Sequence, residues 1–303
     1  MSPSPNDAPQ ILELAATHGL ELKPDSLSVN EAGLDYRVVM ARGLDDTQWV
    51  LRIPRRDDVS EKLDAERRIL DFIAPRLGVA VPQWQVANRR LIAYRALPGK
   101  PGLTLDPATS QPIWHFDNTS RVYAQEFGRL LQRMHAIDIE EARRAGLVVE
   151  TPEQVRANWA ADIARVRSEF DVEASLARRW ESWLADDSYW PRHVVMTHGE
   201  MYPAHVLLNP DDTITGVLDW TTAKVGDPAR DFVFQKMLGV DAVFEATVDA
   251  YVKAGGKVWD RLGDHCTELL AAGPVGYAIY ALVTGAPEHR AAAQAQLKPS
   301  GAM

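Results

Sequence analysis

The first hundred residues show short runs of apolar and β-branched side chains, which are typical of strands. The runs lie at 36–40, 49–53 and 84–96. The turn residues Gly43-Leu44-Asp45-Asp46 stand between the first two runs and predict an antiparallel hairpin. Before the third run, apolar residues at helical spacing predict a helix over 60–74 with Ser60 as its N-cap. This part of the chain therefore predicts a mostly antiparallel sheet with one helix.

After a stretch rich in Pro and Gly at 97–102, the pattern changes to that of helices. Helical periods recur at 122–137, 155–170 and 174–185. A β-like island interrupts the helical region, with its three short strands at 194–196, 205–208 and 214–218. We therefore predict an α+β fold of two lobes. Residues 1–97 form a small β-rich lobe, and residues 98–303 form a larger helical lobe that contains the island.

Composition limits the class of protein. Hydrophobic residues make up 46% and charged residues 25% of the 303 residues, which excludes a largely disordered or collagen-like chain. The formal charge of −9 disfavours phosphate backbones and anionic lipid, so we expect no nucleic-acid and no membrane partner. Cys266 is the only cysteine, so no intrachain disulfide can form. This usage fits a reducing compartment, and we expect a cytoplasmic protein.

One segment reaches the length of a membrane span, because residues 269–286 form a run of 18 residues without a charge. Pro274 follows Gly273 in this run, where a lipid-exposed backbone would lose a hydrogen bond. We therefore interpret the segment as a buried helix of the helical lobe.

Polar residues lie at the ends of the island strands, where they emerge from apolar runs at one rim. Thr197-His198-Gly199-Glu200 ends the first strand, His205 begins the second, and Asp219-Trp220 ends the third. Phosphoryl transfer needs such a rim, with a carboxylate that orients the acceptor hydroxyl and two ligands that fix Mg²⁺ against the phosphates. Glu200, His205 and Asp219 are candidates for these three roles.

Two other chemistries fit the sequence poorly. A zinc site is disfavoured because the histidines at 198 and 205 lack the H-E-x-x-H spacing and no cysteine is near them. A Ser-His-Asp hydrolase is disfavoured because the chain contains no G-x-S-x-G motif.

The order of these residues resembles a known family. His198-x-Glu200, the ligand position five residues later, the Asp219-Trp220 pair and the segment Gly226-Asp227-Pro228-Ala229-Arg230-Asp231 look like the antibiotic phosphotransferases of the protein-kinase-like fold. Most of that superfamily has Asn at the ligand position. Histidine there, together with the segments at 49–55 and 91–94, resembles the macrolide 2′-phosphotransferases. The resemblance extends from about residue 28 to 290.

The resemblance implies a kinase that moves the γ-phosphate of GTP to the 2′-hydroxyl of a macrolide amino sugar, with Mg²⁺ as cofactor. Glu200 would accept the proton of the hydroxyl, and His198 would hold the catalytic loop. His205 and Asp219 would hold the metal ion. We expect a monomer that binds a purine nucleotide and a macrolide.

Further roles follow from the resemblance. Arg52 stands where a phosphate-binding lysine usually stands, and Glu66 on the next helix is its candidate ion-pair partner. Residues 93–97 would form the hinge that contacts the purine, with Tyr94 and Ala96 as candidates. The candidates for acceptor binding are Asp231, Pro274 and Tyr277.

Simpler interpretations of several residues stay open. Arg52 and Glu66 are also compatible with solvated positions on a strand and a helix. Asp227 before Pro228 is compatible with a helix cap, and Asp231 with a charge on a helix surface. The segment 273–280 is compatible with a core helix.

Glu200 departs from the family, which has Asp at this position. The extra methylene displaces the carboxylate by about 1 Å, and a misplacement of that size costs on the order of 10²-fold in rate. Either the acceptor pocket is shifted to suit Glu200, or catalysis is slow, or the residue is an artificial replacement. The rival functions are an aminoglycoside or other small-molecule kinase of the same fold and, because of Glu200 and Arg52, a nucleotide-binding pseudokinase.

Overall fold

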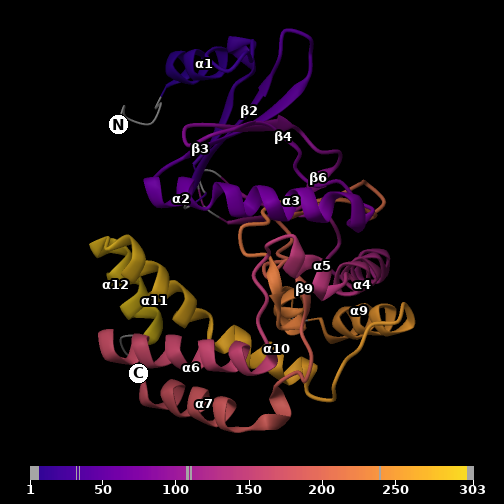
Figure 1. Ribbon diagram of the computed structural model, residues 1–303, viewed down its shortest axis with the longest axis vertical. Helices are drawn as coiled ribbons and strands as arrows, with labels where there is room; N and C mark the ends of the chain where they lie inside the picture. Colours follow the sequence, from indigo (N-terminus) through magenta and orange to yellow (C-terminus); the bar gives the residue numbers. More distant parts are fainter. Residues whose placement is uncertain are drawn as a thin grey trace. The chain divides into compact units, whose positions relative to one another are not determined.

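The computed structural model describes residues 7–31, 33, 35–106, 109, 111–238 and 240–298 (Figure 1). The chain divides into two compact units, each built from three segments. The first unit contains Met1–Glu126, Ala145–Leu147 and Tyr202–Thr222, and the second contains Phe127–Arg144, Val148–Met201 and Ala223–Met303. The first unit thus extends beyond the predicted boundary at residue 97. It does so because the strand at 206–208 pairs with a strand at 100–101 on one side and with the strand at 214–217 on the other.

A five-stranded antiparallel sheet forms the centre of the first unit, in the order β1-β2-β3-β5-β4. Its strands are β1 (Ser28–Asn30), β2 (Tyr36–Arg42), β3 (Gln48–Pro54), β4 (Trp84–Ala87) and β5 (Ile92–Arg95). β2 and β3 pair from Tyr36↔Pro54 to Arg42↔Gln48, which confirms the predicted hairpin. β4 and β5 confirm the predicted strand pair between residues 84 and 96.

Helices cover both faces of this sheet, with α1 (Ala8–Ala16) on one side and α3 (Leu63–Leu77) on the other (Figure 1). Side chains of a strand alternate between its faces. On β3, Leu51 joins the core cluster that contains residues of α1, whereas Val50 joins the cluster that contains Leu63 of α3. Arg52 has the same parity as Val50, and it therefore lies on the face covered by α3.

The helix predicted over 60–74 is α3, but its start is not where the sequence suggested. A short helix α2 (Asp57–Glu61) precedes it and includes Ser60, whose hydroxyl donates to the carbonyl of Arg89 at 3.0 Å. The prediction of Ser60 as N-cap is therefore wrong. The helix ends at Gly78, which adopts the left-handed conformation with φ +75° that favours glycine.

Two smaller sheets complete the first unit. The strands β6 (Lys100–Pro101), β10 (Val206–Leu208) and β11 (Ile214–Val217) form one sheet in the order β11-β10-β6, and β7 (Leu103–Leu105) pairs with β8 (Pro112–Trp114). The predicted island is wrong in one respect, because the strand near 194–196 is not part of the β10–β11 sheet. That strand, β9 (Val195–Thr197), pairs with β12 (Lys224–Gly226) in the second unit.

The second unit is mainly helical. Its helices are the C-terminal part of α4 (Arg121–His135), α5 (Ile139–Arg144), α6 (Pro152–Glu169), α7 (Ala174–Ala185), α8 (Val233–Met237), α9 (Asp241–Lys253), α10 (Leu262–Ala271), α11 (Gly273–Thr284) and α12 (Pro287–Leu297). The three predicted helices at 122–137, 155–170 and 174–185 are confirmed as α4, α6 and α7. Thr151 and Gln154 start α6 with a reciprocal capping box.

The uncharged segment 269–286 forms parts of two helices rather than the single helix predicted. α10 and α11 meet at Ala272, and Pro274 lies in the first turn of α11, where its missing N–H costs nothing. Val275, Ala278 and Ala281 of α11 are buried. Among the described residues, no single helix is long and apolar enough to cross a membrane. The helices α10 and α11 reach the required length and hydropathy only when taken together, and the chain bends by about 40° between them.

Candidate active site

A buried ion pair lies under the five-stranded sheet. Nη1 of Arg52 is 2.5 Å from Oε1 of Glu66, and both side chains are almost fully buried. The Arg52 guanidinium also lies 4.0 Å from the centre of the Tyr36 ring. The predicted pairing of Arg52 with Glu66 is confirmed, and the solvated alternative is wrong.

The guanidinium of Arg52 stays charged at this depth. Burial alone would lower the pKa of Arg52, but the negative charges around it, first that of Glu66, raise its pKa overall. Asp219 is close enough to contribute to the same increase. A guanidinium has five N–H donors, and among the described residues the bond to Glu66 uses one nitrogen, so this group has the chemistry to bind an anion such as phosphate as well.

Asp219 follows β11 in a turn whose backbone is unusual. Its φ is +58°, a left-handed conformation that Asp and Asn adopt more readily than other residues with a side chain. Oδ1 of Asp219 accepts a hydrogen bond of 2.6 Å from the Thr221 hydroxyl. Trp220 is fully buried, and its indole N–H donates to the carbonyl of Val217. This anchoring fixes the position of the partly exposed Asp219 carboxylate.

His205 faces Asp219 within the first unit. Nε2 of His205 is 3.8 Å from Oδ2 of Asp219, and the amide of Leu218 donates to the carbonyl of His205 at 2.8 Å. The predicted metal pair is therefore brought together. A carboxylate oxygen suits Mg²⁺, which takes one or two protein ligands and completes its shell with phosphates and water, while an imidazole nitrogen is a less usual ligand. The described residues contain no group of three or more His, Cys, Asp or Glu side chains suited to a metal.

The loop His198-Gly199-Glu200 belongs to the second unit, and hydrogen bonds hold its backbone. The amide of His198 donates to Oδ2 of Asp231 at 3.2 Å, and the amide of Gly199 donates to Oδ1 at 2.7 Å. The amide of Glu200 donates to Nδ1 of His198, and the Arg230 guanidinium donates to the carbonyl of Gly199. The partly exposed side chain of Glu200 thus projects from a rigid backbone.

This geometry fits the predicted role of His198 as the residue that holds the loop. His198 is fully buried. Its Nδ1 accepts from the amide of Glu200, so this nitrogen carries no proton and the proton lies on Nε2. Gly199 supplies a φ of +85°, which turns the chain between the two side chains.

Asp231 lies at the centre of this network rather than on a surface. It has no exposed area, and besides the two loop amides it accepts from Nε2 of His135 at 3.0 Å. Nδ1 of His135 lies 2.9 Å from the hydroxyl of Tyr251, which burial gives a raised pKa of about 12. The interpretation of Asp231 as a surface charge is wrong. Its predicted contact with an amino sugar gains no support from this geometry, because the carboxylate has no exposed area.

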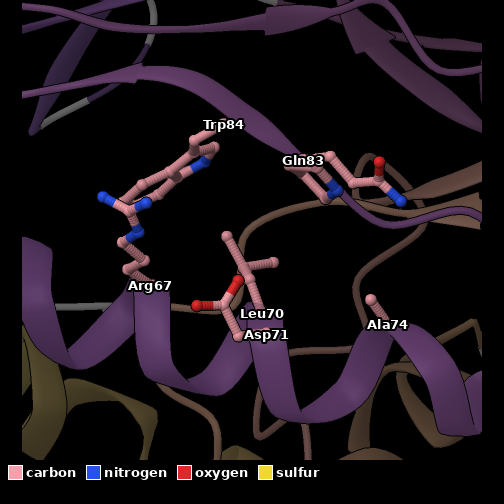
Figure 2. Close-up of a pocket in the computed structure, with 7 residues that line it drawn as sticks. Arg67, Leu70, Asp71, Ala74, Gln83 and Trp84 are labelled. Atoms are coloured by element: carbon pink, nitrogen blue, oxygen red, sulfur yellow. The ribbon is translucent and has the colours of Figure 1, made fainter.

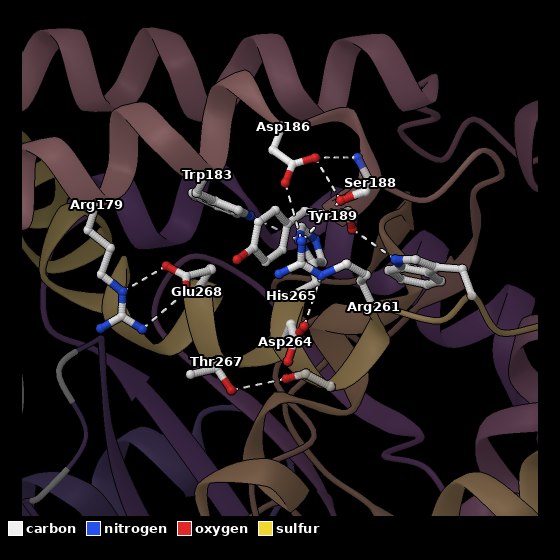
Figure 3. Close-up of polar contacts among 12 residues, drawn as sticks. Arg179, Trp183, Asp186, Ser188, Tyr189, Arg261, Asp264, His265, Thr267 and Glu268 are labelled. Carbon is white, nitrogen blue, oxygen red and sulfur yellow. Dashed lines mark hydrogen bonds and ion pairs between the residues drawn. The ribbon is translucent and has the colours of Figure 1, made fainter.

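Asp227 caps the short helix of 3-10 type, Pro228–Asp231, that carries Asp231. Its Oδ1 accepts from the amide of Ala229 at 2.9 Å, as expected for a cap before Pro228, and its Oδ2 lies 2.7 Å from Nε2 of His265. Trp183 donates its indole N–H to Nδ1 of the same histidine (Figure 3). Because an indole only donates, the His265 proton must lie on Nε2 and point at Asp227.

Contacts between α7 and α10 support His265 from both sides (Figure 3). Arg179 of α7 forms a two-pronged ion pair with Glu268 of α10, at 2.8 and 3.1 Å. Arg261, just before α10, lies 3.7 Å from the centre of the Tyr189 ring and bonds to Asp186. These contacts fix α10 and with it His265, which holds Asp227 at the start of the short helix that carries Asp231.

The predicted hinge residues lie on β5 and just after it. Tyr94 is buried in the core cluster below the sheet, and burial raises its pKa to about 12. Its side chain is thus a core residue. The amide of Ala96 donates to the carbonyl of Gln48 at 2.8 Å, so this N–H is used within the protein.

The predicted acceptor residues of α11 are partly buried. The ring of Tyr277 lies 6.0 Å from that of Tyr280 and 6.5 Å from that of His289 on α12. An added Cβ at Gly276 would meet no atom within 4 Å, and Val283 is 60% exposed. One side of α11 therefore packs in the core, as the simpler interpretation expects, while the other side is exposed and uncharged.

Sequence reasoning missed His135, Tyr251 and Arg230 as supports of the loop. His135 lies within the periodic run at 122–137, and a histidine near the apolar positions of a predicted helix is a signal of a buried polar contact. Tyr251 gave no such signal, because its partner is 116 residues away in the chain.

Comparisons with known proteins show which family the chain belongs to. The chain is similar to the macrolide 2′-phosphotransferase MphH from Brachybacterium faecium, at 49% identity and a TM-score of 0.90, over 99% of this chain and 100% of that one. It is similar to the structure of a macrolide 2′-phosphotransferase type I at 42% identity, with the same TM-score and coverage. It is also 36% identical over 282 residues to the uncharacterized protein YcbJ of Bacillus subtilis (strain 168), covering 92% of each chain.

These similarities confirm the predicted α+β, protein-kinase-like fold and the resemblance to macrolide 2′-phosphotransferases. The phosphotransferase enzyme family matches residues 26–265, which is most of the chain. The protein therefore belongs to the phosphotransferase enzyme family and is a kinase.

Proposed function

We propose that this kinase transfers the γ-phosphate of GTP to the 2′-hydroxyl of the amino sugar of a macrolide antibiotic. The observation that carries the proposal is the 49% identity to a macrolide 2′-phosphotransferase over 99% of the chain. The arrangement of the loop at 198–200 supports it, because the backbone holds one partly exposed carboxylate in a fixed position. The product would be a phosphorylated macrolide and GDP.

Glu200 is the proposed general base. The acceptor hydroxyl oxygen forms a bond to the γ-phosphorus while the bond between that phosphorus and the bridging oxygen of GDP breaks, and the hydroxyl proton moves to the Glu200 carboxylate. Asp231 contributes by positioning, since its two oxygens hold the amides of His198 and Gly199. A loop held in this way keeps the carboxylate in place without reorganisation during the reaction.

The first unit supplies the proposed contacts to the nucleotide. Phosphotransferases of the kinase-like fold use a nucleotide and Mg²⁺, which screens the phosphate charge when it is bound. Asp219 would be the main ligand of this ion and His205 the second, because their side chains already face each other. Arg52 would bind phosphate oxygens with the donors that Glu66 leaves available.

The purine would lie beside the segment 93–97. The side chain of Tyr94 and the amide of Ala96 are engaged within the protein, so recognition would use other backbone groups of this segment. We propose GTP as the donor from the similarity to the macrolide branch.

The macrolactone ring would rest on the exposed side of α11. This helix contains no charged residue, and Gly276 and Val283 leave an open, apolar surface on it. Aminoglycosides carry several positive charges and would need clustered carboxylates, which α11 does not provide. This difference favours a macrolide over an aminoglycoside.

A nucleotide-consumption assay tests the proposal. The purified protein is given Mg·GTP or Mg·ATP with erythromycin, with an erythromycin analogue that lacks the 2′-hydroxyl, or with kanamycin. We expect turnover with GTP and erythromycin, mass and NMR spectra that place the phosphate on the 2′-oxygen, and background rates with the analogue and kanamycin. Turnover with kanamycin but not with erythromycin would contradict the proposed substrate. Thermal stabilisation by Mg·GTP without turnover on either antibiotic would instead indicate a pseudokinase.

Variants of Glu200 test the proposed base. Glu200→Gln should reduce kcat to near background, because an amide cannot accept the proton. If the pocket is adapted to the longer side chain, Glu200→Asp should lower kcat by roughly 10²-fold. If the pocket is not adapted, Glu200→Asp should raise kcat. Parent-like turnover by Glu200→Gln would show that the carboxylate is not the base.

A further inference from the structure

A pocket of about 280 Å³ lies on the first unit between α3 and the start of β4, and no step proposed above uses it (Figure 2). Four residues of α3 line it: Arg67, Leu70, Asp71 and Ala74. They are spaced so that they share one face of the helix. The opposite wall is the segment Pro82-Gln83-Trp84. Every lining residue thus belongs to the same unit.

The polar groups of this pocket are not engaged elsewhere. Among the described residues, the exposed side chains of Arg67 and Asp71 form no ion pair or hydrogen bond, although they lie one helical turn apart, and the exposed side chain of Gln83 likewise has no hydrogen-bond partner. The indole Nε1 of Trp84 is buried and has no hydrogen-bond partner among the described residues. This nitrogen has almost no accessible area, so a ligand in the pocket can lie against the Trp84 ring but cannot bond to its N–H.

The positions of these groups define two ends and a floor. In Figure 2, Arg67 extends from α3 toward the indole of Trp84 at one end of the pocket, while the Asp71 carboxylate rises beside Leu70. Leu70, Ala74 and Pro82 supply apolar surface between these groups. Arg67 offers donors for a carboxylate, and Asp71 offers an acceptor for an ammonium group.

Opposite charges on adjacent turns restrict the ligand. A simple anion would be attracted by Arg67 and repelled by Asp71. A simple cation would be attracted by Asp71 and repelled by Arg67. The volume lies at the lower limit of ligand pockets, which commonly measure about 300–1,000 Å³. A ligand that satisfies both charges and the apolar floor must be small and must carry both charges itself.

We propose that this pocket binds a small zwitterion with an apolar side chain, such as a free α-amino acid. Its carboxylate binds the guanidinium of Arg67, its ammonium group binds the carboxylate of Asp71, and its side chain packs on Leu70 and Pro82. The site is separate from the proposed contacts to nucleotide and acceptor, none of which involves these residues.

Three probes with the same phenyl group test the proposal: L-phenylalanine, 3-phenylpropanoate, which lacks the ammonium group, and 2-phenylethylamine, which lacks the carboxylate. Binding is followed on the full-length protein labelled with ¹⁵N-tryptophan, and the indole signal of Trp84 is assigned with the Trp84→Phe variant. We expect L-phenylalanine to shift this signal most strongly. The two singly charged probes should bind at least about tenfold more weakly, since a hydrogen bond between charged groups corresponds to at least that factor.

Charge variants separate the two ends of the site. Arg67→Gln and Asp71→Asn should each lower the affinity for L-phenylalanine by about tenfold. Only Arg67→Gln should lower the affinity for 3-phenylpropanoate. The double variant Arg67→Asp with Asp71→Arg should recover part of the L-phenylalanine affinity, because a zwitterion can bind in the reverse orientation. Arg143→Gln on α5, outside the pocket, is the control that should change nothing.

Two results would overturn the proposal. One is the absence of any Trp84 shift with L-phenylalanine at roughly 10 mM, a concentration that detects even weak sites. The other is equal binding of the three probes, or an affinity for L-phenylalanine that Arg67→Gln and Asp71→Asn leave unchanged. None of these measurements uses turnover, so they are independent of the proposed antibiotic substrate.

Discussion

Replacing Asp231 with Asn should separate the loss of loop position from the loss of stability. The Asp231 carboxylate accepts three buried hydrogen bonds, from the amides of His198 and Gly199 and from His135. Asparagine keeps one acceptor oxygen and presents an NH₂ group to at least one of these donors. Hydrogen bonds to a charged group contribute about 1.5–3 kcal/mol each, and breaking a buried pair on one side costs about 3–5 kcal/mol.

We therefore expect Asp231→Asn to lower the free energy of unfolding by about 3–5 kcal/mol, a large part of the 5–15 kcal/mol typical of native proteins. Without its anchors the backbone at Gly199 should shift by about 1 Å, which displaces Glu200 and lowers kcat by roughly 10²-fold. KM for the nucleotide should change little, because Asp231 makes no proposed contact with it.

Asp227→Asn is the matched control. Asp227 is also almost fully buried and also accepts from a histidine and a backbone amide, but it acts on the loop at 198–200 only indirectly, by capping the short helix that carries Asp231, so its replacement should lower stability with a smaller loss of kcat. Thermal unfolding gives the stability of both variants, and kcat is measured at a temperature at which both are folded. If the two variants lose stability and kcat in the same proportion, the proposed positioning role of Asp231 is wrong.

Three further predictions concern metal, nucleotide and pH. Asp219→Ala and His205→Ala should each abolish Mg²⁺-dependent turnover while circular dichroism shows an intact fold; near-normal activity in either variant would remove that residue from the metal site. Arg52→Ala should raise the KM for nucleotide far more than that for macrolide, with Arg52→Lys the mildest change, and equal effects on both substrates would contradict phosphate binding. The raised pKa of Tyr94, about 12 against about 10 when unfolded, means that the folded state keeps a proton that the unfolded state loses between these values, so stability falls as pH rises through this window. Between pH 9 and 11, the free energy of unfolding measured with urea should fall by about 1.4 kcal/mol more in the parent than in Tyr94→Phe, which lacks the hydroxyl. An equal fall in both proteins would refute the raised pKa of Tyr94.

The elements that the sequence predicted correctly are those with a strong local pattern. The hairpin of β2 and β3 has β-branched runs on both sides of a turn, and α4, α6 and α7 repeat apolar residues over three turns or more. The pairing of β9 with β12 was missed because β12 has only three residues, Lys224–Gly226, and no pattern can be read from so few. The sequence wrongly predicts Ser60 as a cap because neither Gly nor Pro marks the break between α2 and α3.

The candidate site was predictable where a charged side chain directly follows a predicted strand, as for Glu200 and Asp219. It was not predictable where a residue acts through distant partners. Asp231 looks in sequence like any acidic residue one turn after a cap, and only the fold brings it under a loop that lies 32 residues earlier in the chain. The pairing of Arg52 with Glu66 was predictable only through resemblance, since two charged residues 14 positions apart carry no local signal.

The left-handed backbone at Asp219 sets which substitutions this position can accept. At φ +58°, Gly, Asn and Asp are the residues that cost little, and of these only Asp carries a charge. A substitution of Asp219 by Glu would keep the charge but would strain the backbone at this position. At position 200 the positive φ belongs to the preceding Gly199, so the backbone places no such restriction on the acidic side chain. Variation among related sequences should therefore interchange Asp and Glu at the position of the base while holding Asp at the position of the metal ligand.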